Sequence, residues 1–137
     1  MTRAGLLFDH LRAYRGQRFE WSSCNCATFA GAWVLRATGR DVLAGLQADS
    51  ALGWSRVVRE LGGLRSAVTA RMTGGEILPT LARMGDIMLL PGHRTGASAG
   101  GTLGICCGRT VACLAETGLV HVERAQALCA WRLEVPA

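Results

Sequence analysis

The sequence contains no lysine, and arginine supplies all 15 of its strongly basic residues. This bias is more typical of GC-rich coding sequences than of a binding requirement, since solvated surfaces normally use both residue types. The arginines are scattered from Arg3 to Arg132, with no basic run and no stripe in which arginine alternates with aromatic residues. Despite the formal net charge of +5, we therefore expect no nucleic-acid partner.

Long apolar runs are missing as well. Glycine, arginine or an acidic residue interrupts every stretch before it reaches the roughly 18 apolar residues that a membrane span needs, so we expect no such span. The apolar core of the N-terminal segment is too short for a signal peptide. We therefore expect synthesis in the bacterial cytoplasm, a reducing compartment in which the six cysteines stay thiols.

The length and the apolar content point to one small domain with a partner. A chain of 137 residues is of the commonest domain size, and we expect a single domain over residues 1–137. Half of its residues are hydrophobic, and the mean hydropathy of +0.23 is high for a free-standing domain of this size. This content predicts that another protein covers part of the apolar surface.

The first half of the chain has the apolar periodicity of amphipathic helices, with residues recurring at three- and four-residue intervals. Caps and glycines mark where these helices begin and end. The pattern predicts a helix carrying Leu7, Leu11 and Tyr14, a helix that Asn25 caps and Gly39 ends, a third helix from the Asp49-Ser50 cap to Gly62-Gly63, and a weaker helix over 64–72.

The second half changes to short apolar runs separated by turns, which is the pattern of strands. The predicted strands cover residues 87–90, 102–107, 110–115 and 119–122 and form an antiparallel meander. Residues 125–134 predict a short helix followed by an edge strand. Helices followed by a meander indicate an α+β domain.

Cys26 occupies the start of the second helix, directly after the predicted N-cap Asn25. A helix N-terminus favours the nucleophilic thiolate form of a cysteine, because unpaired N–H groups and the positive end of the helix dipole are there. Cys26 also shares an apolar stripe with Phe29 and Trp33, so it can equally be a small core residue. The helix position alone favours the core interpretation.

Several short motifs follow one another in a characteristic order. They are the aromatic residue Trp21, Asn25-Cys26-x-x-Phe29 at a helix start, Gly85-Asp86 at a strand start, Leu103-Gly104-Ile105 in the next strand, and the closing Gly118-Leu119-Val120 and Ala130-Trp131-Arg132 segments. Over residues 16–133 this order resembles the NlpC/P60 branch of papain-like cysteine peptidases, and it looks closest to the short phage and prophage tail proteins of that group. The resemblance implies a papain-like fold with N-terminal helices packed on a small antiparallel sheet.

The resemblance places Cys26 at the position of the nucleophile and Thr102 at the position of the activating histidine. It places the group that orients the histidine at Ala112 or Cys113. A cysteine peptidase needs a thiolate, an imidazole and an orienting polar group, and threonine cannot act as a general base near neutral pH. This pattern predicts a degenerate site. It also implies that Trp21 borders the substrate cleft.

Three histidines are available as replacement bases. His93 lies in the loop between the first two predicted strands and is the best placed of them. His121 is on a strand, on the face opposite Val120 and Val122, and an exposed position is the commoner outcome. His10 is on the first helix and is expected to be solvated.

The remaining candidates favour structural roles. Adjacent Cys106 and Cys107 in a strand point to opposite faces, so they cannot ligate one ion, and we expect no metal or cofactor. Asp86 is expected to accept backbone N–H bonds in a turn. The tryptophans other than Trp21 are expected in the core.

Two functional hypotheses follow. In the first, the chain is a virion component at a phage or phage-like tail tip, catalytically degenerate, that docks onto hub, fibre or distal tail proteins. In the second, it is an active peptidoglycan endopeptidase that aids genome delivery, with Cys26 as nucleophile and a relocated histidine. Thr102 and the apolar content favour the first.

Overall fold

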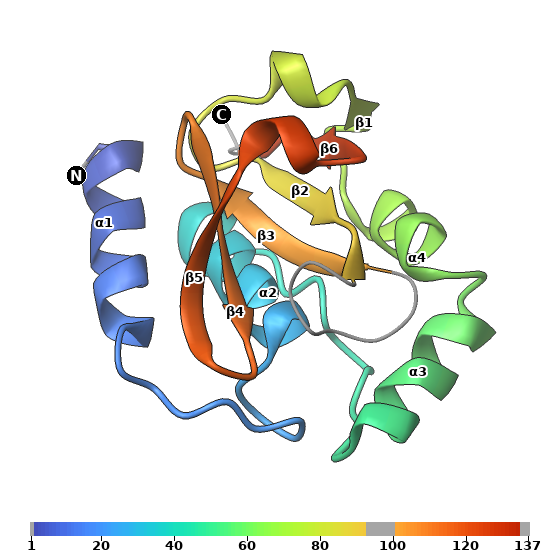
Figure 1. Cartoon of the computed structure of the whole chain (residues 1–137). Helices are drawn as coiled ribbons and strands as arrows, with labels where there is room; N and C mark the ends of the chain where they lie inside the picture. The colour runs from blue at the N-terminus through green and yellow to red at the C-terminus, as the bar shows by residue number, and fades with distance from the viewer. Residues whose placement is uncertain (1, 93–100, 135–137) are drawn as a thin grey trace.

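The computed structural model describes residues 2–92 and 101–134, in which four α-helices precede a six-stranded antiparallel sheet (Figure 1). The helices are α1 (Arg3–Tyr14), α2 (Cys26–Thr38), α3 (Ala51–Glu60) and α4 (Leu64–Arg71). The predicted α+β class is confirmed. Within the described residues, none of the helices combines the length and the apolarity needed to cross a membrane.

The sheet contains the predicted meander. The strands are β1 (Glu76–Ile77), β2 (Ile87–Leu90), β3 (Thr102–Cys106), β4 (Thr110–Ala115), β5 (Gly118–Glu123) and β6 (Cys129–Trp131), with short 3-10 helices η1 (Pro79–Leu81) and η3 (Arg124–Gln126). They lie in the order β1-β6-β2-β3-β4-β5, and each neighbouring pair is antiparallel. Strands β2 to β5 are consecutive neighbours, as expected.

The end of the chain departs from the prediction. A helical turn, η3, does precede a strand, but β6 is not an edge strand, because it pairs with β2 on one side and with β1 on the other. Strand β1 takes the edge, and its two residues are too few to show a period in the sequence. The chain leaves β5 at one edge and returns to the other half of the sheet, a non-local step that no local pattern encodes.

Side-chain caps set the starts of three helices. Thr2, Asn25 and Ser50 each accept a backbone N–H bond at the start of α1, α2 and α3. Helix α2 ends at Gly39, whose φ of +80° is a left-handed conformation that favours glycine. Each side-chain cap contributes about 1 kcal/mol to helix stability. The caps predicted at Asn25, Ser50 and Gly39 are confirmed.

One face of the sheet carries the larger core. Helix α2 packs on β3 and β4, and α1 packs on α2 (Figure 1). Phe29 and Trp33 of α2 are fully buried against Ile105 and Trp131 of the sheet. The indole Nε1 of Trp33 donates a 2.7 Å hydrogen bond to the carbonyl oxygen of Gly85. This bond satisfies the polar atom of a buried indole and fixes α2 against the start of β2.

The other face of the sheet holds a second, smaller core. Its buried residues are Ala82, Met88, Leu90, Cys106, Val111, Cys113 and Ala130. No α-helix contributes to this cluster within the described residues; instead Ala127, which follows η3, packs against it. Short connections thus cover a face that helices cover elsewhere, and η1 and η3 contact each other there.

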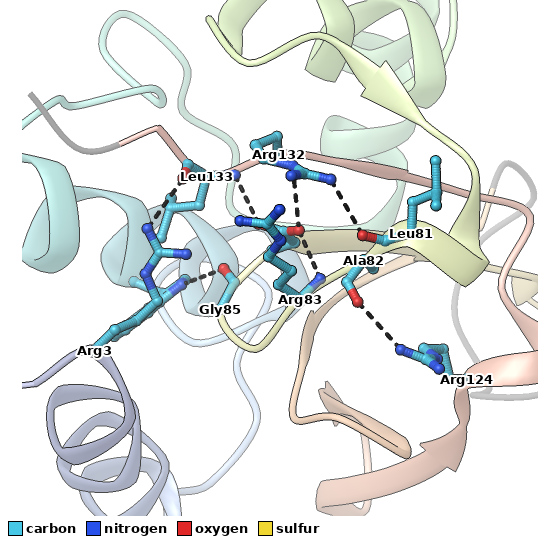
Figure 2. A network of polar contacts seen from close by, with 10 residues as sticks. Arg3, Leu81, Ala82, Arg83, Gly85, Arg124, Arg132 and Leu133 are labelled. Atoms are coloured by element: carbon cyan, nitrogen blue, oxygen red, sulfur yellow. Dashed lines mark hydrogen bonds and ion pairs between the residues drawn. The ribbon is translucent and has the colours of Figure 1, made fainter.

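Asp86 is fully buried and connects the start of β2 to the end of the chain. Figure 2 labels its partners Arg83, Arg132 and Leu133. The carboxylate of Asp86 accepts the backbone N–H of Arg83 at 2.8 Å and that of Leu133 at 2.9 Å. The Nε atom of Arg132 lies 3.9 Å from the same carboxylate. Arg3 donates to the carbonyl oxygen of Leu133, so the start of α1 joins this network. The structural role predicted for Asp86 is confirmed.

We expect Asp86→Ala to lower the free energy of unfolding by about 3 kcal/mol, because two buried N–H groups lose their acceptor and the guanidinium of Arg132 loses its charge partner. Urea unfolding followed by circular dichroism measures the change. Asp86→Asn keeps one acceptor oxygen and is expected to lose less stability. A loss of less than about 1 kcal/mol in Asp86→Ala would contradict this account.

His10 is buried, so the prediction of a solvated side chain was wrong. Its Nε2 atom lies 3.1 Å from the carbonyl oxygen of Phe29, which makes Nε2 the protonated nitrogen. Its ring packs on Tyr14, Phe29 and Trp33, and its Nδ1 atom has no hydrogen-bond partner among the described residues. His10 follows Leu7 by three residues and precedes Tyr14 by four, so it lies on the apolar stripe itself.

Burial lowers the pKa of His10; the hydrogen bond with Phe29 opposes this shift and the charge of Arg36 adds to it. The unfolded chain therefore binds the proton more readily, and stability present above about pH 6.5 is lost as the pH falls. We expect wild type to lose more unfolding free energy than His10→Gln between about pH 7.5 and about pH 5, measured with urea. Identical losses in the two proteins would show that His10 does not cause the effect.

Candidate functional site

Cys26 is the first residue of α2, held in place by the cap before it. The Oδ1 atom of Asn25 accepts the N–H groups of Ala27 and Thr28 at 2.9 and 3.0 Å. The hydroxyl oxygen of Thr28 accepts the N–H of Asn25 at 2.8 Å, which completes a capping box. Because Asn25 is buried, this box positions the Cys26 side chain rigidly.

Trp21 lies shortly before this helix start and is half-buried. Its ring packs edge-on against Phe19, with ring centroids 4.9 Å apart. Its carbonyl oxygen accepts a 2.7 Å hydrogen bond from Nδ2 of Asn25 and a second hydrogen bond from the indole N–H of Trp54 in α3. The backbone of Trp21 therefore joins the cap of Cys26 to α3. The other three tryptophans are buried, as predicted.

The Cys26 thiol meets the start of β3. Burial raises the pKa of Cys26, and backbone N–H groups of Leu103, Ala27 and Cys26 itself act in the opposite direction without outweighing it. The contact with Leu103 places the sulfur beside the residue that follows Thr102. A helix N-terminus favours the thiolate, but here desolvation is the larger effect. The thiol is therefore protonated at neutral pH.

The strand register separates Ala112 from Cys113, the two residues that the resemblance offered for the orienting group. Thr102 is fully buried and pairs with Leu90, whose side chain lies in the smaller core together with Cys113. Ala112 lies in the larger core, on the opposite face. Burial, together with the nearby Cys26, raises the pKa of Cys113 to about 12. Of the two alternatives, Cys113 is the residue that shares a face with Thr102 and lies near Cys26.

Gly104, two residues after Thr102, is required by the close approach of β4. A Cβ atom at Gly104 would lie 2.7 Å from the carbonyl oxygen of Ala112 and 2.5 Å from a methyl group of Val111. Any side chain there would separate β3 from β4 beside the Cys26 thiol. The close approach of β4 explains why a glycine lies between Leu103 and Ile105 in the Leu-Gly-Ile motif.

The histidines are not brought to Cys26 by the described part of the chain. His121 is exposed on β5, and its Nδ1 atom lies 3.2 Å from the hydroxyl of Thr110. It pairs with Ala112 and so faces the helices, opposite Val120 and Val122, as predicted. Strand β5 is two strands away from β3, a separation of about 10 Å. His93 lies outside the described residues.

A comparison with protein families places the chain. A family model described as a domain of unknown function, DUF6950, matches residues 3–133. The chain belongs to the DUF6950 family. No curated protein matches it. The match runs from the start of α1 to Leu133. Cys26, Thr102 and Cys113 therefore all lie within the matched residues.

The six cysteines of this DUF6950 domain are all free. Cys106 is buried in the smaller core and Cys107 packs against the larger one, on opposite faces as predicted. Among the described residues, no three histidine, cysteine, aspartate or glutamate side chains are grouped in a way that could hold a metal ion. Cys113 and Cys129 are buried core residues, as expected.

The sequence left Ala112 and Cys113 as alternatives for the orienting group, although it contains a signal that distinguishes them. The turn at Gly108-Arg109 brings Cys107 opposite Thr110, and the N–H of Cys107 donates to the carbonyl oxygen of Thr110 at 2.8 Å. Counting back from that pair places Cys113 opposite Gly104. The contact of Cys26 with the backbone of Leu103 had no such signal, because backbone N–H groups are the same at every residue.

At about pH 7 we expect Cys26 to react with iodoacetamide more slowly than glutathione does, because its raised pKa keeps it protonated. The rate is expected to rise only when the pH exceeds the pKa of an ordinary thiol. Peptide mapping by mass spectrometry follows each cysteine separately, and Cys26→Ser identifies the peptide. Faster reaction than glutathione at neutral pH would indicate an activated thiolate.

Proposed function

We propose that this DUF6950 protein has a papain-like fold related to that of NlpC/P60 peptidases and is catalytically degenerate. The observation that carries the proposal is the position of Cys26. Its thiol lies at a capped helix start, against the strand that begins with Thr102 and near Cys113. These positions support the proposal, because the resemblance assigns nucleophile, base and orienting group to Cys26, Thr102 and Cys113, and of the three only Cys26 keeps the residue type that such a peptidase uses.

The chemistry of the three side chains argues against turnover. Threonine neither accepts a proton from a thiol near neutral pH nor protonates a leaving amine, and losing general acid–base catalysis costs a factor of roughly 10² to 10⁴ in rate. Cys113, with a pKa of about 12, is a neutral thiol and orients no imidazole. The raised pKa of Cys26 removes the thiolate as well. Each part of the acid–base relay is thus absent from these positions.

The biological role that fits a degenerate peptidase domain is structural. We propose that the protein is a virion component at the tail tip of a phage or phage-like particle, where it docks onto hub, fibre or distal tail proteins and contacts peptidoglycan. The high apolar content and exposed large apolar side chains such as Leu52 and Leu78 support a protein partner.

The first test of this proposal is zymography on purified cell walls. We expect neither wild type nor Cys26→Ala to clear the wall, because the wild-type site lacks a base. Both proteins must have the same circular dichroism spectrum for the comparison to hold. Clearing by wild type that Cys26→Ala abolishes would establish the alternative, an active endopeptidase in which a relocated histidine such as His93 activates Cys26.

A second measurement tests the alignment itself. If Thr102 occupies the imidazole position, Thr102→His places a ring beside the Cys26 sulfur and lowers the pKa of the thiol. We then expect alkylation of Cys26 at about pH 7 to become faster by roughly tenfold, since one pKa unit corresponds to tenfold more thiolate. Folded Thr102→His with an unchanged Cys26 rate would count against the proposed relationship.

A further inference from the structure

Residues 78–84, which connect β1 to β2 through η1, expose several large apolar side chains. Leu78 is 66% exposed, Leu81 is 56% exposed and Met84 is 41% exposed. A single exposed leucine needs no explanation, but three large apolar side chains on one seven-residue segment form a patch. We call residues 78–84 the η1 segment.

A groove of about 840 Å³ lies beside the η1 segment. One wall is formed by η1, and the other by the β3–β4 turn, the end of β5 and η3. The groove is lined by Leu78, Pro79, Thr80, Arg109, Thr110, Glu123, Arg124, Ala125 and Ala127. It is large enough for several side chains of an extended peptide.

The lining of the groove has an excess of positive charge. Arg109 and Arg124 line it. Figure 2 shows Arg132 and Arg124 holding the η1 segment from two sides, with bonds to the carbonyl oxygens of Leu81 and Ala82. Arg132 is paired with the buried Asp86, so its charge is compensated. Among the described residues of the lining, Glu123 is the one acidic residue against two arginines, which leaves a net positive charge.

We propose that this groove docks an extended acidic segment of a partner protein that also carries apolar anchors. The carboxylates of the segment would pair with Arg109 and Arg124, and its apolar side chains would cover Leu78 and Leu81. Charge complementarity of this kind guides association and selects among partners. The inference gives the proposed structural role a surface and rests on that role.

The lining of the groove argues against the other polyanions. Proteins that bind single-stranded nucleic acid stack bases on aromatic rings, and none of the described residues that line this groove is aromatic. A surface that lies on an anionic membrane presents a basic, apolar face outward. Here the arginines of the lining face a hollow that also contains Glu123. A peptide fits into a hollow, whereas a bilayer surface does not.

The groove is remote from the candidate peptidase site along the strand. Cys26 contacts the start of β3, and Arg109 follows the end of the same strand. Substitutions in the groove therefore leave the Cys26 environment unchanged. For this reason cell-wall clearing and peptide binding are independent measurements, and the failure of one does not imply the failure of the other.

The test uses the full chain and two fluorescein-labelled peptides of twelve residues, in which leucine alternates with glutamate or with lysine. We expect fluorescence anisotropy to show binding of the glutamate peptide that weakens with salt, and no binding of the lysine peptide. Arg109→Glu and Leu78→Ser are each expected to raise the Kd roughly tenfold. Arg56→Glu, an equally exposed substitution on α3, serves as the matched control and is expected to bind like wild type.

Three results would overturn the proposal. The first is an absence of glutamate-peptide binding by folded wild type, and the second is equal weakening in Arg56→Glu, which would indicate attraction to net charge alone. The third is co-sedimentation with phosphatidylglycerol vesicles, or binding of a thirty-nucleotide single strand, that depends on Arg109 while the glutamate peptide does not bind. That outcome would assign the groove to a different anionic partner.

Discussion

The buried carboxylate of Asp86 is the interaction on which the arrangement of the rest depends. It lies between the two halves of the sheet and accepts bonds from residues that precede β2 and follow β6. The adjoining Gly85 carbonyl holds Trp33 of α2, and Leu133 holds Arg3 of α1. One residue therefore positions both N-terminal helices relative to the sheet. Two backbone N–H donors and the nearby guanidinium of Arg132 compensate the buried charge.

Two effects of opposite sign meet at Cys26. The capped start of α2 supplies N–H groups and the positive end of the helix dipole, which lower the pKa of a thiol. Packing against β3 removes water, which raises the pKa, and burial is the larger effect here. Under the proposed relationship to peptidases, an imidazole at Thr102 would reverse this balance. The capped and packed start of α2 itself depends only on the fold and requires no catalytic chemistry.

Several arginines of this chain bind backbone carbonyl oxygens. Arg71 holds Val42 and Ala44 with one nitrogen, and Arg124 and Arg132 hold the η1 segment. A planar guanidinium can satisfy several acceptors at once while part of it stays in water. The same side chains thus fix loops that no helix covers and leave positive charge on the surface that those loops form.

The sequence by itself determined the class of the fold, most of its elements and the local role of several residues. The helix periodicity, the Asn25 and Ser50 caps, the turn at Gly108-Arg109 and the meander are local signals, and the structure contains each of them. Only the tertiary structure decided where β6 pairs, that His10 is buried, and that the backbone of Leu103 contacts Cys26. These depend on contacts between residues far apart in the chain. The free energy of such contacts comes from burial and shared hydrogen bonds, which periodicity and spacing do not record.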